Sequence, residues 1–415
     1  MQQVKDRPIR VLAADDSVVM RGVLRRLFQM QEQKLASDLP VMELCDVVED
    51  GIECLAAVAR LRPDVLVLDL EMPRMNGLEV LKQLRQDESG LLVILCSAHT
   101  ELGARATFDA LALGASDYVM KPCDQKDSAT SMEALANQLL PKIAALAGSR
   151  FEIASEIREE TMRMQIAHAA RPSNVTQTDF FSSASKVEIV VIGISTGGPS
   201  ALEKMLPQLS ENFPVPVMIV QHMPKLFTGE LADRLDRVCS LRVCEAYDGA
   251  EIRRGTIWVA PGDAHMEVCE AAKGVRRGVV LLHQQSALNN CKPSVDYLFS
   301  SAATLYGAGV LALVMTGMGS DGLTGARHVH EAGGVVLTQD RATSAVWGMP
   351  GRVFQSGISH ESLPLNALAG ELTRRTQAKR SGRELSALSS LEMIPQLQSE
   401  NFVCASHPEV NHGLL

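Results

Sequence analysis

The chain has 415 residues, of which 46% are hydrophobic, so it can bury more than one core and global disorder is excluded. Its formal net charge of −9 argues against a bulk nucleic-acid binder, because phosphate contacts need clustered Lys and Arg. Nine cysteines without a C-x-x-C pair favour a reduced chain over a disulfide framework. There is no signal-peptide pattern and no apolar run of about 18 residues. We therefore expect a cytoplasmic protein without membrane insertion.

The first 147 residues alternate short apolar runs with amphipathic helical patterns. The apolar runs are residues 9–15, 41–48, 64–70, 91–97 and 117–121. Strands that alternate with helices indicate a parallel sheet covered on both faces, and near-continuous apolar runs are typical of its buried strands. We predict a five-stranded, flavodoxin-like α/β domain over residues 1–130.

A second α/β pattern begins near residue 187, after a helix and linker predicted over residues 131–186. A polar helical pattern covers 151–170, and the next residues are rich in Ser, Thr, Asn and Pro. Strand-like runs follow at residues 186–193, 216–222, 255–261, 278–283, 309–317 and 333–339. We predict a doubly wound, mostly parallel sheet over residues 187–375 and a flexible polar tail over 376–415.

Polar residues follow the predicted strands of the first domain at their carboxyl ends. They are Asp15, Asp16, Asp69, Ser97 and Lys121. Parallel strands end at the same rim of a sheet, so three carboxylates, a hydroxyl and an ammonium should meet there. Mg²⁺ relieves the repulsion between such carboxylates. Each residue alone has a simpler interpretation, such as a helix cap or a surface lysine, but all five at strand ends favour a phosphoryl-acceptor pocket.

Residues 9–125 resemble the receiver domain of two-component response regulators. The motifs that carry the resemblance are ADDS at 14–17, DLEMPRMNG at 69–77, CSA at 96–98 and DYVMKP at 117–122. The resemblance implies that a sensor histidine kinase supplies the phosphoryl group to Asp69.

The same resemblance implies roles for the residues around Asp69. Mg²⁺ would be held by Asp15, Asp16, Asp69 and the backbone carbonyl of Glu71. The phosphoryl group would be contacted by Ser97 and Lys121. The aromatic switch position would be occupied by Tyr118.

The second domain opens with VIGISTGGP at 191–199, for which three interpretations compete. Its G-x-S-x-G spacing is that of a nucleophile elbow with Ser195 as the nucleophile. A phosphate-binding loop is disfavoured, because the stretch lacks the Walker lysine and the second glycine of G-x-G-x-x-G. The third interpretation is a strand-to-helix turn in which Ser195 is only the N-cap.

A serine nucleophile needs a base and an acid that orients the base. His222 ends the next strand pattern, so it shares an edge with Ser195 if the two strands are neighbours. Asp321 follows a later apolar strand and a glycine-rich loop. Two further histidines, His265 and His283, also end or follow strand-like runs and compete for the role of base. The order Ser–His–Asp differs from that of the α/β-hydrolases.

The second domain resembles the catalytic domain of chemotaxis methylesterases of the CheB type. The matching pieces are GISTGGP at 193–199, VQHMP at 220–224, APG at 260–262, KPSVDYLF at 292–299, TGMGSDG at 316–322 and GMP at 348–350. The resemblance implies a triad of Ser195, His222 and Asp321, with the Met318 N–H in the oxyanion hole and Thr196 beside the site. One departure is Cys291-Lys292, where the family usually has His-Arg.

The two resemblances together imply a phosphorylation-activated hydrolase of glutamate methyl esters on methylated chemoreceptors. Glutamine deamidation is a second expected activity of the same triad, and the ester chemistry needs no cofactor. The alternative is a receiver-controlled binding module without catalysis. A generic hydrolase of small esters is a third hypothesis, in which the rate would not depend on Asp69.

Overall fold

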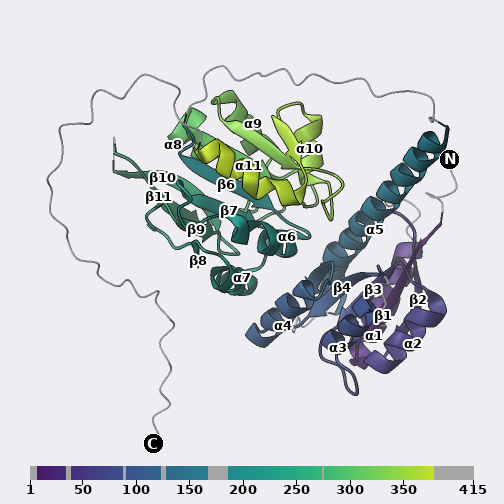
Figure 1. Ribbon diagram of the computed structural model, residues 1–415. Helices are drawn as coiled ribbons and strands as arrows, with labels where there is room; N and C mark the ends of the chain where they lie inside the picture. Colours follow the sequence, from purple (N-terminus) through teal and green to yellow (C-terminus); the bar gives the residue numbers. More distant parts are fainter. Residues whose placement is uncertain are drawn as a thin grey trace, which may run out of the picture. The chain divides into compact units, whose positions relative to one another are not determined.

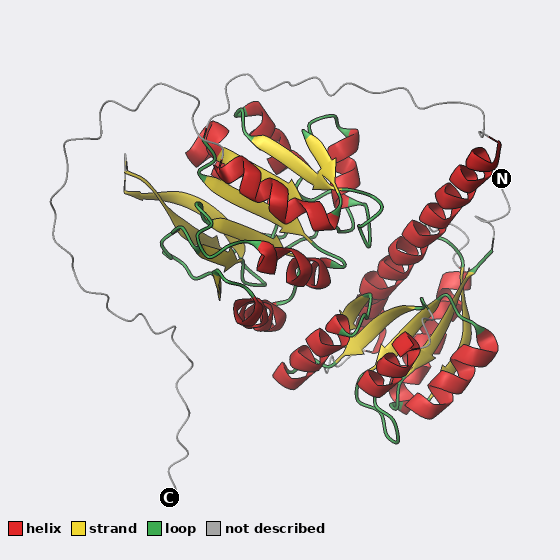
Figure 2. Ribbon diagram, viewed as in Figure 1, coloured by secondary structure: helices red, strands yellow, loops and turns green. Residues whose placement is uncertain are grey.

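The computed structural model describes residues 7–33, 39–86, 90–122, 128–166, 186–272 and 275–377. The described chain contains two parallel sheets with flanking helices and a separate two-stranded sheet (Figures 1 and 2). The predicted linker after residue 166 and nearly all of the predicted tail lie outside the described residues.

The first sheet has five parallel strands in the order β2-β1-β3-β4-β5, as the sequence predicts. The strands are β1 (Ile9–Ala14), β2 (Met42–Val48), β3 (Val65–Asp69), β4 (Leu92–Ser97) and β5 (Asp117–Met120). The helices are α1 (Val18–Gln33), α2 (Gly51–Leu61), α3 (Gly77–Gln86), α4 (Glu101–Ala112) and α5 (Ser128–Ile166).

Alternate residues of each strand in this sheet face opposite layers of helices. Val11 and Ala13 belong to the core that includes Phe28 of α1 and Leu139 of α5. Leu12, the residue between them, belongs instead to the core formed with α2, α3 and α4. This two-residue period buries both faces of the sheet and leaves the strand ends as the place for polar groups.

The second sheet has seven parallel strands in the order β14-β13-β12-β6-β7-β9-β8. Its strands are β6 (Ile189–Ile194), β7 (Val217–Gln221), β8 (Arg242–Glu245), β9 (Thr256–Val259), β12 (Val310–Val314), β13 (Val335–Gln339) and β14 (Glu361–Leu363). The doubly wound, parallel architecture predicted for this domain is confirmed, although β8 and β14 were not predicted from the sequence.

Helices cover both faces of the second sheet. One face packs on α8 (Val295–Tyr306), α9 (Leu323–Glu331) and α10 (Met349–Gln355). The other packs on α6 (Gly198–Met205), α7 (Lys225–Val238) and α11 (Leu365–Gln377), and the short 3₁₀ helices η1 (Leu206–Gln208) and η2 (Gly307–Gly309) complete the domain. Most core side chains are aliphatic, with a few aromatic rings such as Phe227 and Phe299 among them.

The run at 278–283 does not join the seven-stranded sheet. It forms part of β11 (Val275–His283), which pairs antiparallel with β10 (His265–Ala272) in a separate two-stranded sheet. Periodicity detects an extended segment, but only its pairing partner decides which sheet it enters.

The helix predicted over 151–170 is the later part of a longer element. Helix α5 begins at Ser128 and continues to Ile166, so it crosses the predicted domain boundary at residue 130. Over the described residues, no helix combines the length and the apolar character that a bilayer crossing requires.

Candidate active site and acidic pocket

The carboxyl ends of three neighbouring strands in the second sheet bring the predicted site residues together. Ser195 follows β6, and His222 follows the adjacent strand β7, with the His222 N–H donating to the Ile194 carbonyl (3.1 Å). On the other side of β6, strand β12 leads into the loop that ends at Asp321. The condition stated from the sequence, that the strands before Ser195 and His222 are neighbours, is met.

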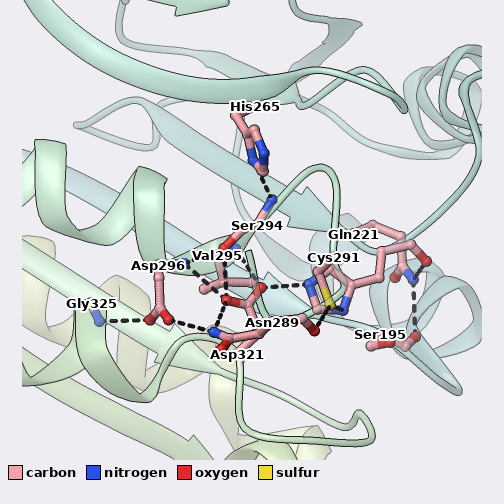
Figure 3. Close-up of polar contacts among 11 residues, drawn as sticks. Ser195, Gln221, His265, Asn289, Cys291, Ser294, Val295, Asp296, Asp321 and Gly325 are labelled. Carbon is pink, nitrogen blue, oxygen red and sulfur yellow. Dashed lines mark hydrogen bonds and ion pairs between the residues drawn. The ribbon is translucent and has the colours of Figure 1, made fainter. Parts of the chain in front are cut away.

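Asp321 accepts hydrogen bonds from several groups at this edge of the sheet, and Figure 3 shows these contacts. Its Oδ2 lies 2.7 Å from His222 Nε2 and accepts the Val295 N–H (2.7 Å), while Oδ1 accepts the Ser294 hydroxyl (2.7 Å). Burial alone would raise the pKa of Asp321. The hydrogen bonds from His222, Val295 and Ser294 outweigh it and lower the pKa to about 2. Asp321 is therefore a carboxylate throughout the neutral pH range.

The ionised Asp321 determines which nitrogen of His222 accepts protons. A carboxylate beside Nε2 favours the tautomer with the proton on Nε2, so the lone pair of the neutral ring is on Nδ1. Burial lowers the pKa of His222, but the hydrogen bonds with Asp321 and with the Cys291 thiol raise it to about 9. The imidazolium is thus the main form at neutral pH.

Cys291, rather than Ser195, is the neighbour of His222 Nδ1. Its Sγ lies 3.6 Å from Nδ1. Within the described part of the chain, no hydrogen bond joins the Ser195 side chain to His222. Catalytic hydrogen bonds in substrate-free structures often form only when the substrate binds, so this geometry is compatible with a Ser–His pair.

The backbone around Ser195 is fixed by hydrogen bonds with neighbouring loops at the sheet edge. The Ser195 N–H donates to the Thr316 carbonyl (3.0 Å), and buried Gln221 Nε2 donates to the carbonyls of Ser195 (3.0 Å) and His222 (3.2 Å). A Cβ at Gly317 would lie 2.8 Å from Ser195 Cβ, so only glycine permits this approach of the two loops.

Ser195 is not the N-cap of the following helix, so that interpretation of the motif is wrong. The cap of α6 is Gly197, whose left-handed φ of 75° explains why a glycine stands there. The Ser195 side chain is therefore not used to begin the helix.

The two residues predicted beside the triad lie on the same loops. Met318 is in the loop between β12 and α9, and among the described residues its N–H has no hydrogen-bond partner. Thr196 is buried, and its carbonyl accepts the Thr316 hydroxyl (2.9 Å). An N–H without a hydrogen-bond partner is a candidate donor to a developing oxyanion.

The competing histidines have other partners. His265 Nδ1 accepts the Ser294 N–H (3.2 Å), and its Nε2 lies 3.2 Å from the Ser286 carbonyl. Its ring stacks on that of His283, with centroids 5.2 Å apart. His265 thus supports the segment that begins α8, and this arrangement favours His222 as the base.

The first sheet forms an acidic pocket at its carboxyl edge. Asp15, Asp16 and Asp69 each offer a carboxylate oxygen within 4.8 Å of the others. Lys121 Nζ lies 2.6 Å from Asp69 Oδ2 and 2.9 Å from Asp15 Oδ2. Burial raises the pKa of Asp69 to about 6, a rise that Lys121 opposes and Asp15 reinforces. A hard divalent cation fits this all-oxygen set, because it would offset the two buried carboxylates.

The remaining predicted pocket residues surround Asp69 without all facing it. The Glu71 N–H donates to Asp69 Oδ1 (3.3 Å). Ser97 is buried at the end of β4, where its hydroxyl accepts from Thr107 (2.7 Å) and donates to the Gly103 carbonyl (3.2 Å). Tyr118 lies on β5, paired with Leu95 of β4.

Four residues around the active site received no role from the sequence. They are Gln221, Asn289, Ser294 and Asp296. Asp296 accepts the Gly325 N–H (2.7 Å), and Asn289 Nδ2 donates to it (3.0 Å) beside Asp321. Three of the four lie within the VQHMP and KPSVDYLF motifs. The motifs therefore contained these residues, but only the hydrogen-bond network shows which groups their side chains contact.

Comparisons with known proteins agree with this geometry. A family model described as CheB methylesterase matches residues 190–372, and one described as a response regulator receiver domain matches residues 11–133.

Curated relatives match over nearly their whole length. One from Trichodesmium erythraeum (strain IMS101), named protein-glutamate methylesterase/protein-glutamine glutaminase, is 41% identical over 88% of this chain and 98% of its own. A second of the same name, from Nocardioides sp. (strain ATCC BAA-499 / JS614), is 43% identical over 90% of this chain and 96% of its own.

Proposed function

Because the chain belongs to the protein-glutamate methylesterase/protein-glutamine glutaminase family, we propose that it hydrolyses glutamate methyl esters on chemoreceptors under the control of its own receiver domain. The observation that carries this proposal is the convergence of Ser195, His222 and Asp321 at one sheet edge, with His222 Nε2 2.7 Å from Asp321 Oδ2. We further propose domain boundaries at 1–130, 131–186, 187–375 and 376–415, and a cytoplasmic location.

In the proposed mechanism, Ser195 Oγ attacks the ester carbonyl of a methylated glutamate and passes its proton to His222 Nδ1. The tetrahedral intermediate then expels methanol, which takes that proton, and leaves an acyl-serine. Water attacks the acyl-serine with the same nitrogen as base and releases the glutamate. Asp321 keeps the ring in the tautomer that this cycle needs. The Ser195 hydroxyl must replace the Cys291 thiol as the partner of Nδ1 during catalysis.

The negative oxygen of the tetrahedral intermediate needs a hydrogen-bond donor. We assign this role to the Met318 N–H, and we place Thr196 beside the reacting carbonyl. Backbone donors in a water-poor site stabilise a developing oxyanion without reorganisation. Amide and ester hydrolysis share the acyl-enzyme path, so glutamine deamidation is the second activity proposed for the same residues.

In the receiver, we propose that Asp69 accepts the phosphoryl group from a sensor histidine kinase. Asp15, Asp16, Asp69 and the Glu71 carbonyl would hold Mg²⁺, which neutralises phosphoryl charge when bound. Ser97 and Lys121 would then contact the phosphoryl oxygens. Tyr118 would be the aromatic switch residue, whose side chain changes position on phosphorylation. We propose that the unmodified receiver covers the triad edge and that phosphorylation favours an uncovered state.

Methanol release from methylated receptor membranes tests both the ester hydrolysis and its control by phosphorylation of Asp69. A small phosphodonor with Mg²⁺ is expected to raise the rate about 5- to 150-fold, which is the usual range of coupling free energies between sites. Asp69→Asn should remove this rise, because the acceptor carboxylate is lost. Glu43→Gln, an exposed carboxylate on β2, is the matched control and should keep it. Activation that survives in Asp69→Asn would contradict the role of the pocket.

The pH dependence of hydrolysis follows from the raised pKa of His222. With a pKa of about 9, only about 1% of the rings are neutral at pH 7, and only the neutral ring accepts a proton. We therefore expect kcat/KM to rise about tenfold per pH unit above pH 7 and to level off near pH 9. The charged ring also stabilises the fold below pH 6.5, a contribution lost as the pH rises through about 9.

Cys291→Ala separates this effect from a general alkaline effect. The thiol hydrogen bond raises the pKa of His222, so its removal should move the rise in kcat/KM to lower pH. An unchanged profile in Cys291→Ala, or a flat one in the unmodified chain, would show that another group sets the pH dependence.

A further inference from the structure

Cys291 lies next to the proposed catalytic base, His222, although the proposed mechanism assigns it no chemical role. It lies in the loop before α8 and is half-buried, so solvent reaches it. Its Sγ lies 3.6 Å from His222 Nδ1 and donates to the Asn289 carbonyl (3.4 Å). The thiol and the ring nitrogen therefore face each other across a short gap.

The separation of these two atoms is that of two ligands on one zinc ion. With Zn–S at about 2.3 Å, Zn–N at about 2.0–2.1 Å and a tetrahedral angle, sulfur and nitrogen lie about 3.6 Å apart. The observed distance from Cys291 Sγ to His222 Nδ1 is 3.6 Å. Zinc could enter between them without moving either side chain away from the other.

The second nitrogen of the ring is arranged as zinc-binding histidines require. A ligating histidine usually donates its other N–H to a carboxylate, which fixes the tautomer and makes the ligating nitrogen more basic. His222 Nε2 lies 2.7 Å from the buried Asp321 carboxylate, which leaves the Nδ1 lone pair for the metal. Asp321 itself is committed to His222, Ser294 and Val295, so it orients the ligand rather than binding the ion.

We propose that Cys291 Sγ and His222 Nδ1 form an inhibitory binding site for Zn²⁺ or a similar thiophilic divalent cation. At neutral pH the Cys291 thiol and the His222 imidazolium each release a proton to solvent when Sγ and Nδ1 bind the metal, and water fills the other coordination positions. The bound ion occupies the lone pair that would accept the Ser195 proton, so hydrolysis stops while zinc is bound. Among the described cysteines, Cys291 alone lies in a cluster of three side chains with potential ligand atoms, in which Asp321 orients His222.

The inhibitory effect of this site rests on the proposed function. Metal binding does not, because it is measurable without substrate. Co²⁺ is a spectroscopic substitute for Zn²⁺, and a cobalt–thiolate bond absorbs in the near ultraviolet. Titration of the full chain with Co²⁺ should produce this band, and Zn²⁺ should displace it. Cys291→Ala and Cys291→Ser should lack the band. The matched control Cys269→Ala, a half-buried cysteine on β10, should keep it.

Inhibition gives the second readout. Zn²⁺ should inhibit methanol release by the unmodified chain. Cys291→Ala should need at least about 10- to 100-fold more Zn²⁺, since loss of a ligand costs no less than loss of the group that orients one. Asp69→Asn should remain as sensitive as the unmodified chain, because the acidic pocket of the receiver is not the inhibitory site.

The possible results separate the metal site from the proposed function. Equal inhibition of Cys291→Ala and the unmodified chain, or a cobalt–thiolate band that survives in Cys291→Ala and Cys291→Ser, would overturn the zinc site. A Cys291-dependent band in a chain that releases no methanol would support the site and overturn the proposed esterase function. Thermal unfolding of the variants shows whether they keep the fold.

Discussion

Ser195→Ala is expected to lower kcat for methyl ester hydrolysis by about 10⁴- to 10⁶-fold, the usual loss when a triad nucleophile is removed. The reason is chemical, because no acyl-enzyme forms without the hydroxyl. Cys291 Sγ lies beside His222 Nδ1, so Ser195→Ala,Cys291→Ala is expected to show the same residual rate as Ser195→Ala if the thiol does not replace the hydroxyl. Binding and oxyanion stabilisation account for the residual rate.

The change should leave the fold intact, because the hydrogen bonds around Ser195 use its backbone and not its hydroxyl. Ser210→Ala, an exposed serine after η1, is the matched control and should keep full activity. Methanol release and thermal unfolding of both variants are the measurements. Ser195→Ala with a rate within tenfold of the unmodified chain would remove Ser195 from the mechanism, and a phosphonate probe would then identify the reactive residue.

Asp321→Asn is the second large effect, with an expected loss of about 10⁴-fold in kcat. An amide at this position can donate its N–H to His222 Nε2, which places the ring proton on Nδ1 and removes the lone pair that the Ser195 proton needs. The variant also loses the negative charge that stabilises the imidazolium. The measurement is kcat across pH 6–10, in which the rise assigned to His222 should shift to lower pH, because Asp321 raises the pKa of that ring.

Asp296→Asn is the comparison variant. It shows whether Asp321 acts by orienting the His222 ring or only by stabilising the neighbouring helices. Asp296 is also buried, and burial raises its pKa to about 6, but it holds Gly325 and Asn289 and does not touch His222. We expect Asp296→Asn to lower the melting temperature with a rate loss far below that of Asp321→Asn. Equal rate losses in the two variants would mean that Asp321 acts only through the fold.

Much of this molecule is readable from local sequence. Apolar runs and helical periods predicted both parallel sheets, because buried parallel strands need continuous apolar sequence and their order along the chain follows the alternation of elements. The polar residues at the predicted strand ends indicate that Asp15, Asp69 and Lys121 share one pocket, and the structure brings them together. The same rule put Ser195 and His222 at one edge only on the condition that β6 and β7 are neighbours, and the structure meets this condition. These features depend on residues a few positions apart, and short-range patterns contain that information.

Other features depended on residues that are distant in the chain. Whether 278–283 joined the main sheet was decided by its antiparallel partner β10. The first part of α5, from Leu135 to Ala147, is fixed by the core of the first sheet that it joins. The contact between Cys291 and His222 joins residues 69 positions apart, and no spacing rule predicts it. Sequence alone determined the fold class and the identity of the triad candidates. Only the tertiary structure decided which atom each candidate faces, because side-chain direction is set by packing and hydrogen bonds across the whole domain.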